Sequence, residues 1–253
     1  TRAQLGHPLM ELSVVIPVLN EAGNIEPLLA EVVAALQGKF DFEIVYVDDA
    51  SDDATPDELA SARRRHPQLR VVSHRHTCGQ STALRSGVIA ARGDWIATLD
   101  GDGQNDPADI PKLFEVARQA AATGQTMLVA GYRKRRQDSN VKRVSSRVAN
   151  AVRSRLLGDA TPDTGCGLKV FARSDFLNLP YFDHMHRFLP ALMKRAGGNV
   201  TSVEVNHRHR QRGASKYGTL DRLAVGVVDL LGVMWLQRRA SIPEASEAQD
   251  ALE

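Results

Sequence analysis

The chain has 253 residues, of which 43% are hydrophobic and 25% charged, and its formal net charge is +2. This composition is typical of a soluble globular protein with one large domain, and the charge is too small to indicate a nucleic-acid partner. The two cysteines, Cys78 and Cys166, have neither metal-site spacing nor the number needed for a disulfide framework. Residues 1–11 lack the profile of a signal peptide, so we expect a cytoplasmic location.

Short apolar runs alternate with amphipathic stretches over the first 130 residues. Helical spacing predicts a helix from Ile25 to Leu36 with Asn24 as its N-cap. Two further helices are predicted over residues 82–91 and 107–122. Strands are predicted at residues 13–16, 43–47, 69–72 and 95–99. Strands alternating with helices predict an α/β fold with a mainly parallel, doubly wound sheet, which binds ligands beyond the carboxyl ends of its strands.

Carboxylates follow the first two predicted strands. The loop at residues 17–21 contains Glu21 and lacks the glycines of a dinucleotide-binding loop. The second loop, residues 48–53, carries Asp49 and further aspartates that can hydrogen-bond a ribose or a base. Ser51 or Asp53 can instead cap the next helix.

The fourth predicted strand runs directly into Asp100-Gly-Asp-Gly-Gln104. Two carboxylates one residue apart, with an amide oxygen two positions on, form an all-oxygen ligand set suited to Mg²⁺ or Mn²⁺. The alternative is an ordinary turn, since Asp and Gly are turn residues. Three acidic loops at one sheet edge favour a metal-assisted site for a nucleoside diphosphate.

Motifs in fixed order along residues 11–236 resemble family 2 glycosyltransferases of the GT-A fold. Within that family the chain is most similar to dolichyl- or polyprenyl-phosphate mannosyltransferases and their bacterial relatives. The motifs are Ser13-Val-Val-Ile-Pro-Val-Leu-Asn-Glu21, Val47-Asp-Asp-Ala-Ser51, Gly79-Gln-Ser-Thr-Ala-Leu-Arg-Ser-Gly87, Asp100-Gly-Asp-Gly-Gln104, Gly131-Tyr-Arg133, Asp163-Thr-Gly-Cys-Gly-Leu-Lys-Val-Phe171 and Arg210-Gln-Arg-Gly-Ala-Ser-Lys216.

The resemblance implies a role for each matched position. The residues implied to hold the nucleoside are Pro17, Leu19, Glu21, Val47 and Asp49, although Leu19 replaces a tyrosine that is common there. Those implied at the metal and diphosphate are Asp100, Gly101, Asp102 and Gln104. The implied phosphate contacts are Arg133 and Arg143. A second alignment puts Lys142 in place of Arg143. The resemblance also implies that Arg210 and Lys216 lie on a loop that closes over the diphosphate.

The implied reaction is metal-dependent, inverting transfer of a sugar from a nucleoside-diphosphate sugar to a polyprenyl or dolichyl phosphate. GDP-mannose is the favoured donor, and a UDP-sugar is the alternative. A divalent metal with Arg and Lys side chains stabilises the charge on the leaving diphosphate. The acceptor phosphate is already an anionic nucleophile, so it needs little help from a base. Asp163 is the candidate base or orienting group, unless it only forms the turn at residues 161–165.

Three other functions are weighed against this one. A sugar-1-phosphate nucleotidyltransferase would need a glycine-rich basic loop after the first strand, where residues 17–21 have none. A glycosyltransferase of the same fold with a non-lipid acceptor is compatible with the motifs. A non-catalytic binding module is expected to have lost a metal aspartate or Lys216, and both are present.

The apolar stretch Leu223–Leu236 has about fourteen residues and is interrupted by Asp229, whereas a membrane-spanning helix needs roughly twenty. It fits an amphipathic helix in the membrane interface, with Trp235 at headgroup depth. The alternative is a helix packed on the domain or on a membrane-protein partner. We therefore expect a catalytic domain at residues 11–220, this helix at 221–239, a disordered acidic tail at 240–253, and peripheral association with the cytoplasmic face of a membrane.

Overall fold

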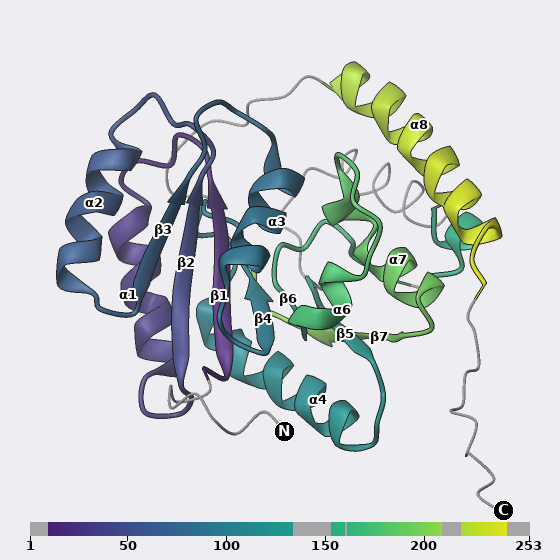
Figure 1. Cartoon of the computed structure of the whole chain (residues 1–253), viewed down its shortest axis with the longest axis horizontal. Coiled ribbons are helices and arrows are strands. Elements are labelled where there is room, and N and C mark those ends of the chain that lie inside the picture. Colours follow the sequence, from purple (N-terminus) through teal and green to yellow (C-terminus); the bar gives the residue numbers. More distant parts are fainter. Residues whose placement is uncertain (1–9, 134–152, 160, 209–218, 242–253) are drawn as a thin grey trace, which may run out of the picture.

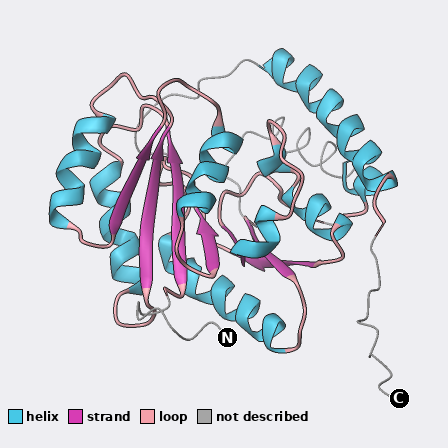
Figure 2. Ribbon diagram, in the orientation of Figure 1, coloured by secondary structure: helices cyan, strands magenta, loops and turns pink. Residues whose placement is uncertain are grey.

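The computed structural model of the chain describes residues 10–133, 153–159, 161–208 and 219–241. The described part of the chain contains a seven-stranded sheet with helices on both faces (Figures 1 and 2). The strand order is β3-β2-β1-β4-β6-β5-β7, and β6 runs antiparallel to both of its neighbours while the other pairs are parallel. The predicted α/β fold with a mainly parallel sheet is confirmed.

The elements have the following bounds. The strands are β1 (Leu12–Val18), β2 (Phe42–Asp48), β3 (Leu69–Ser73), β4 (Trp95–Thr98), β5 (Met127–Tyr132), β6 (Lys169–Ala172) and β7 (Asn199–Glu204). The helices are α1 (Ile25–Leu36), α2 (Thr55–Arg65), α3 (Gln80–Ala90), α4 (Ile110–Ala122), α6 (Arg173–Leu177), α7 (Leu189–Arg195) and α8 (Thr219–Arg238), with short 3₁₀ helices η1 (Pro107–Asp109) and η2 (Met185–Arg187).

Two hydrophobic clusters fill the space between the sheet and its helices. One joins the sheet to α1, α2 and α4, and the other joins it to α3, α6, α7 and α8. Val14 and Val15 of β1 belong to opposite clusters, which is why every residue of this strand except Ser13 is apolar. A Cβ on Gly87 of α3 would lie 2.3 Å from Cγ1 of Val15, so the close seating of α3 on β1 requires glycine there.

Helix starts differ slightly from the prediction. Residues 107–122 divide into η1 and α4, and Asp106 caps η1 by accepting a 3.0 Å hydrogen bond from the Ala108 amide. Helix α3 begins at Gln80, two residues earlier than predicted, after Gly79 at φ +88°. Asn24 takes the N-cap position of α1, but its side chain donates to Glu21 instead of capping the helix.

The topology brings several loops to one end of the sheet, the end at which the parallel strands terminate; this end is called the edge of the sheet below. Strands β1, β2, β4 and β5 end there, and the antiparallel strand β6 begins there. The segments that meet at this edge are therefore residues 19–23, 49–53, 99–105 and 163–168, together with Arg133 directly after β5. Every described residue that the sequence assigned to a site lies on these segments or on the strand ends beside them.

Candidate active site

The loops after β1 and β2 are fastened to each other. The backbone N–H of Asn20 donates to Oγ of Ser51, and the backbone N–H of Glu21 donates to Oγ1 of Thr55, both at 2.9 Å. Ser51 therefore bridges the loops, while Asp53 accepts from the Thr55 amide at the start of α2. Ala50 has φ +63°, a left-handed conformation that is costly for a residue with a Cβ. The loop contacts hold this strained turn directly beside Asp49.

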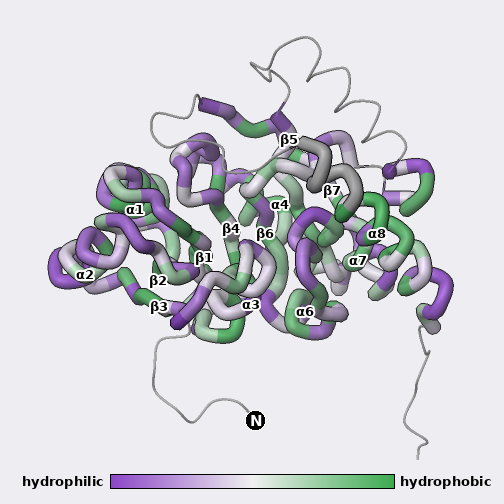
Figure 3. Tube along the Cα trace, turned by 90° about the horizontal axis from the view of Figure 1, so that it is seen from above, coloured by the Kyte–Doolittle hydropathy of each residue, from purple (hydrophilic) through white to green (hydrophobic). Residues whose placement is uncertain are grey.

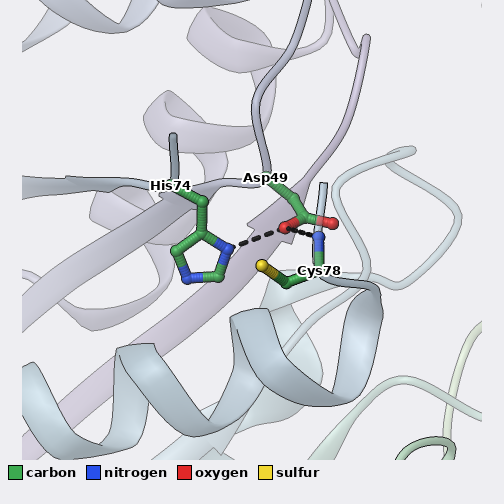
Figure 4. A group of neighbouring side chains, drawn as sticks. All are labelled: Asp49, His74 and Cys78. Carbon is green, nitrogen blue, oxygen red and sulfur yellow. Dashed lines mark hydrogen bonds and ion pairs between the residues drawn. The ribbon is translucent and has the colours of Figure 1, made fainter. Parts of the chain in front are cut away.

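The buried carboxylate of Asp49 is held by three hydrogen bonds. Figure 4 draws the two that come from His74 and Cys78. Its Oδ1 accepts from Nδ1 of His74 at 2.7 Å and from the Cys78 amide at 2.8 Å, and its Oδ2 accepts from the Gly79 amide at 2.8 Å. The other ring nitrogen of His74 lies 2.9 Å from Oγ of Ser86 on α3. The end of β2 is thus tied to β3 and α3 through one aspartate.

Asp49, His74 and Cys78 also offer potential metal-ligand atoms, all within 4.8 Å of one another. In the structure His74 and the Cys78 backbone use their donors on the Asp49 carboxylate, and the Cys78 thiol lies 3.2 Å from the His76 carbonyl. We therefore assign this group to fixing the carboxylate.

The loop after β4 carries two aspartates at the end of the sheet where the site lies. The Asp100 amide donates to Oδ1 of Asn105 at 3.2 Å, and Oδ1 of Asp100 accepts from Nε2 of Gln80 at 3.0 Å. Oδ1 of Asp102 accepts from the backbone N–H of Gln104 at 3.1 Å. A Cβ on Gly101 would lie 2.5 Å from the Val18 side chain, so glycine between the aspartates lets the loop rest on the end of β1.

The aspartate pair is electrostatically suited to a cation. Burial and then the charge of Asp102 raise the pKa of Asp100 from 3.8 to about 6, against the opposing charges of Lys169 and Arg133. Two carboxylates that repel each other, with the side-chain amide oxygen of Gln104 on the same loop, are a ligand set that fits Mg²⁺ or Mn²⁺. The residues present therefore fit the predicted metal.

Two neighbours of Asp100 were missed by the sequence reasoning. A Cβ on Gly167 would lie 2.3 Å from Oδ2 of Asp100, so the backbone before β6 packs directly against this carboxylate. Lys169 is only 5% exposed and its Nζ donates to the Cys166 carbonyl. A lysine within the apolar run of a strand was the available signal, because buried lysines are rare unless they have a partner.

Arg133 and Asp163 form a buried, bidentate ion pair. Nε of Arg133 donates to one carboxylate oxygen at 2.6 Å and Nη2 donates to the other at 2.9 Å, with side chains 10% and 3% exposed. The arrangement fixes the guanidinium plane at the end of β5. Since both oxygens of Asp163 accept from Arg133, the geometry favours the orienting role for Asp163 over the role of base.

The other predicted residues divide into two groups. Pro17 and Val47 are opposite each other in the β1·β2 register, and Leu19 and Glu21 follow β1 beside them. Arg143, Arg210 and Lys216 lie outside the described residues, so their predicted phosphate contacts stay predictions.

The sequence signature of glycosyl transferase family 2 matches residues 13–179, which include the three acidic loops and the Arg133–Asp163 pair. The chain belongs to this family of glycosyltransferases. It is 36% identical over 243 residues to a dodecaprenyl-phosphate galacturonate synthase of Rhizobium johnstonii, covering 92% of this chain and 69% of that protein. It is also 36% identical over 213 residues to an undecaprenyl-phosphate 4-deoxy-4-formamido-L-arabinose transferase of Edwardsiella ictaluri, covering 83% and 63%. The chain thus spans about two thirds of these relatives' length.

Solved structures confirm the GT-A fold of the glycosyltransferase. Glucosyl-3-phosphoglycerate synthase of Mycobacterium tuberculosis, in complex with Mg²⁺ and UDP, superposes with a TM-score of 0.65 at 22% identity, covering 93% of this chain and 81% of that one. A complex of the same synthase with Mn²⁺, UDP and glucosyl-3-phosphoglycerate gives a TM-score of 0.66, covering 97% and 88%.

Proposed function

We propose that this glycosyltransferase transfers a sugar from a nucleoside-diphosphate sugar to a polyprenyl phosphate at a membrane surface, with inversion at the anomeric carbon. The observation that carries the proposal is the partly exposed, mutually repelling Asp100–Asp102 pair at the same end of the sheet as Asp49 and Arg133. That end of the sheet offers a cation site, a fixed carboxylate that can bind the nucleotide base, and an oriented guanidinium that can bind phosphate.

The metal ligands in this proposal are Asp100, Asp102 and Gln104. A bound divalent cation supplies charge that stabilises the leaving diphosphate. Arg133 adds a guanidinium whose plane Asp163 fixes, and guanidinium groups bind phosphate oxygens in two-pronged fashion. Arg143, Arg210 and Lys216 are proposed to contribute further positive charge to the same diphosphate.

For the donor we propose a UDP-sugar over the GDP-mannose that the sequence favoured. The Mycobacterium synthase with the similar fold binds UDP together with Mg²⁺ or Mn²⁺. The nucleoside would lie on the ends of β1 and β2, against Pro17, Leu19, Val47 and Asp49.

For the acceptor we propose a polyprenyl phosphate, because both relatives described above are named for sugar transfer to such lipids. A phosphate monoester carries its own nucleophilic oxygen. The bond from that oxygen to the anomeric carbon forms as the bond to the diphosphate breaks, and the diphosphate leaves with the electron pair. Strong base assistance is therefore unnecessary, in keeping with the use of both Asp163 oxygens by Arg133.

Helix α8 gives the proposal a membrane-facing surface. Val233 is fully buried and Leu230 and Met234 pack against the core, while Asp229 lies 3.1 Å from His184. The opposite face is apolar and exposed, at Val227, Val228, Leu231 and Trp235, which are 50%, 69%, 60% and 59% exposed. Figures 1 and 3 show this helix along one side of the molecule, and its exposed residues suit the interface between lipid headgroups and acyl chains.

One face of the helix therefore packs on the domain, and the other is presented outward. None of the described helices, the twenty-residue α8 included, is both long and apolar enough to cross a membrane. We propose peripheral attachment through the outward face.

The test is transfer of radiolabelled sugar from UDP-sugars and from GDP-mannose to a short polyprenyl phosphate in detergent, with Mn²⁺ or with EDTA. We expect organic-soluble product from a UDP-sugar with Mn²⁺, and no product with EDTA or with the unphosphorylated polyprenol. Asp102→Ala should lower turnover by about a hundredfold, or 2.7 kcal/mol. Asp106→Asn is the matched control, because it removes a neighbouring carboxylate outside the metal pair. Full activity in EDTA would overturn the metal's role, and transfer from GDP-mannose alone would overturn the choice of donor.

A further inference from the structure

His74 is a nearly buried histidine that the proposed chemistry does not use. It follows β3, its backbone amide donates to the Asp48 carbonyl at 2.9 Å, and its side chain is 13% exposed. One ring nitrogen contacts Asp49 in the loop after β2 (Figure 4). The other contacts Ser86 on α3. Because both ring nitrogens of His74 are held, the ring in turn orients the carboxylate of Asp49.

The protonation of the ring follows from its partners. An ionised carboxylate can only accept hydrogen bonds, so Nδ1 of His74 carries the proton that points at Asp49. Nε2 is then the acceptor in the neutral ring, and the Ser86 hydroxyl donates to it. The result is a directed series of hydrogen bonds from Ser86 through His74 to Oδ1 of Asp49.

This series limits what the Asp49 carboxylate can bind. A carboxylate offers about four acceptor positions, two on each oxygen. On Asp49, Oδ1 accepts from His74 and from the Cys78 amide, and Oδ2 accepts from the Gly79 amide. One position is left, on Oδ2.

Nucleotide bases differ in the donors that they bring to such a carboxylate. Guanine presents two adjacent donors, the N1 hydrogen and the 2-amino group, and pairs with both oxygens of a carboxylate. Uracil presents a single N3 hydrogen. A carboxylate with one remaining position on one oxygen matches uracil and leaves one guanine donor without a partner, which is costly in a buried site.

We propose that His74 is a specificity-determining residue that occupies Oδ1 of Asp49 and so selects a uracil base over guanine. The inference rests on the proposed function, because it places the donor's base at Asp49. It adds a physical basis for the choice of base, and a residue that lies outside the family motifs. His74 is a positioning residue, acting on the base through Asp49.

The experiment is calorimetric titration of the full chain with UDP and with GDP, each in the presence of Mn²⁺ and without lipid acceptor. His74→Ala frees a position on Oδ1 and loosens the carboxylate. We expect UDP to bind about tenfold more weakly, in line with the loss of a hydrogen bond to a charged group, while GDP binds no more weakly than before. The UDP-over-GDP preference of the wild type should therefore fall by about tenfold.

Two further variants separate this role from a general effect on folding. In His74→Asn the amide nitrogen takes nearly the place of Nδ1, so donation to Asp49 and most of the UDP preference should return. Ser86→Ala keeps the donor on Asp49 and removes only its support, so it should lose less than His74→Ala. His76→Ala is the matched control, since His76 is an exposed histidine on the same loop. Thermal melts by circular dichroism check that each variant is folded.

The outcomes are distinguishable. A wild type that binds neither nucleotide with Mn²⁺ would overturn the proposed function together with this inference. A wild type that prefers UDP, with an unchanged preference in folded His74→Ala and Ser86→Ala, would overturn the role of His74 alone. Loss of preference in His74→Ala with recovery in His74→Asn would establish it.

Discussion

Replacing Asp100 by asparagine should stabilise the metal-free protein while it disables the enzyme. Burial and the charge of Asp102 raise the pKa of Asp100 from 3.8 to about 6, a difference worth about 3 kcal/mol against the ionised form at pH 7. Water at this partly exposed loop screens part of that energy, so we expect a gain of about 2 kcal/mol. For a chain of this size the corresponding rise in melting temperature is about 4–8 °C.

The pH dependence has a definite sign. A carboxyl whose pKa is higher in the folded state binds more protons when folded, so the metal-free wild type gains stability as the pH falls through about 6 toward 3.8. Between pH 7 and pH 5 the gain is about 1 kcal/mol, and Asp100→Asn should lack it.

Thermal denaturation of both proteins in EDTA at pH 5 and pH 7 measures this difference, and other titrating groups cancel in the comparison. Added Mn²⁺ should raise the melting temperature of the wild type and leave that of Asp100→Asn unchanged. A variant less stable than the wild type at pH 7 in EDTA would refute the argument, because Asp100 would then be a stabilising structural carboxylate.

Three other predictions concern the arginine, the loop and the helix. Arg133→Ala and Asp163→Ala should each lower turnover, and the double variant should lower it no further, because Asp163 acts by orienting Arg133; steady-state kinetics with additive losses would contradict this. Lys216→Ala should reduce transfer and leave the melting temperature nearly unchanged, whereas an unfolded variant would indicate a structural loop. Leu231→Glu and Trp235→Glu should weaken sedimentation with anionic liposomes without changing the melting temperature, and undiminished binding would remove α8 as the anchor.

The sheet and its binding edge could be predicted because local patterns carry them. Parallel strands buried on both faces, such as β1 and β2, are mostly apolar, and the acidic residues at and after their carboxyl ends mark the ligand site. The second half of the sheet escaped prediction. Strand β6 has only four residues, and β7 is half exposed without an apolar face, so neither has a distinctive period. Strand β5 was not predicted either, although it is a buried apolar run of the kind that marks a strand.

The parts of the site that the sequence did not indicate depend on contacts between distant residues. Gln80 reaches Asp100 from α3, and Gly167 approaches it from the segment before the antiparallel strand β6. His74 becomes significant only when β2 and β3 lie side by side. Asp163 was open between base, orienting group and turn residue, and only the bidentate contact with Arg133 favours one of them.

The central claim is that the carboxyl end of β4 holds a divalent cation on a nucleoside diphosphate. The direct measurement is the affinity of the wild type and Asp102→Asn for Mn²⁺, with and without UDP, followed by the electron paramagnetic resonance signal of free Mn²⁺. The account predicts that UDP tightens Mn²⁺ binding to the wild type, that Mn²⁺ tightens UDP binding by the same factor, and that Asp102→Asn loses both effects. Mn²⁺ affinity that is indifferent to UDP in the wild type, or unchanged in Asp102→Asn, would contradict it.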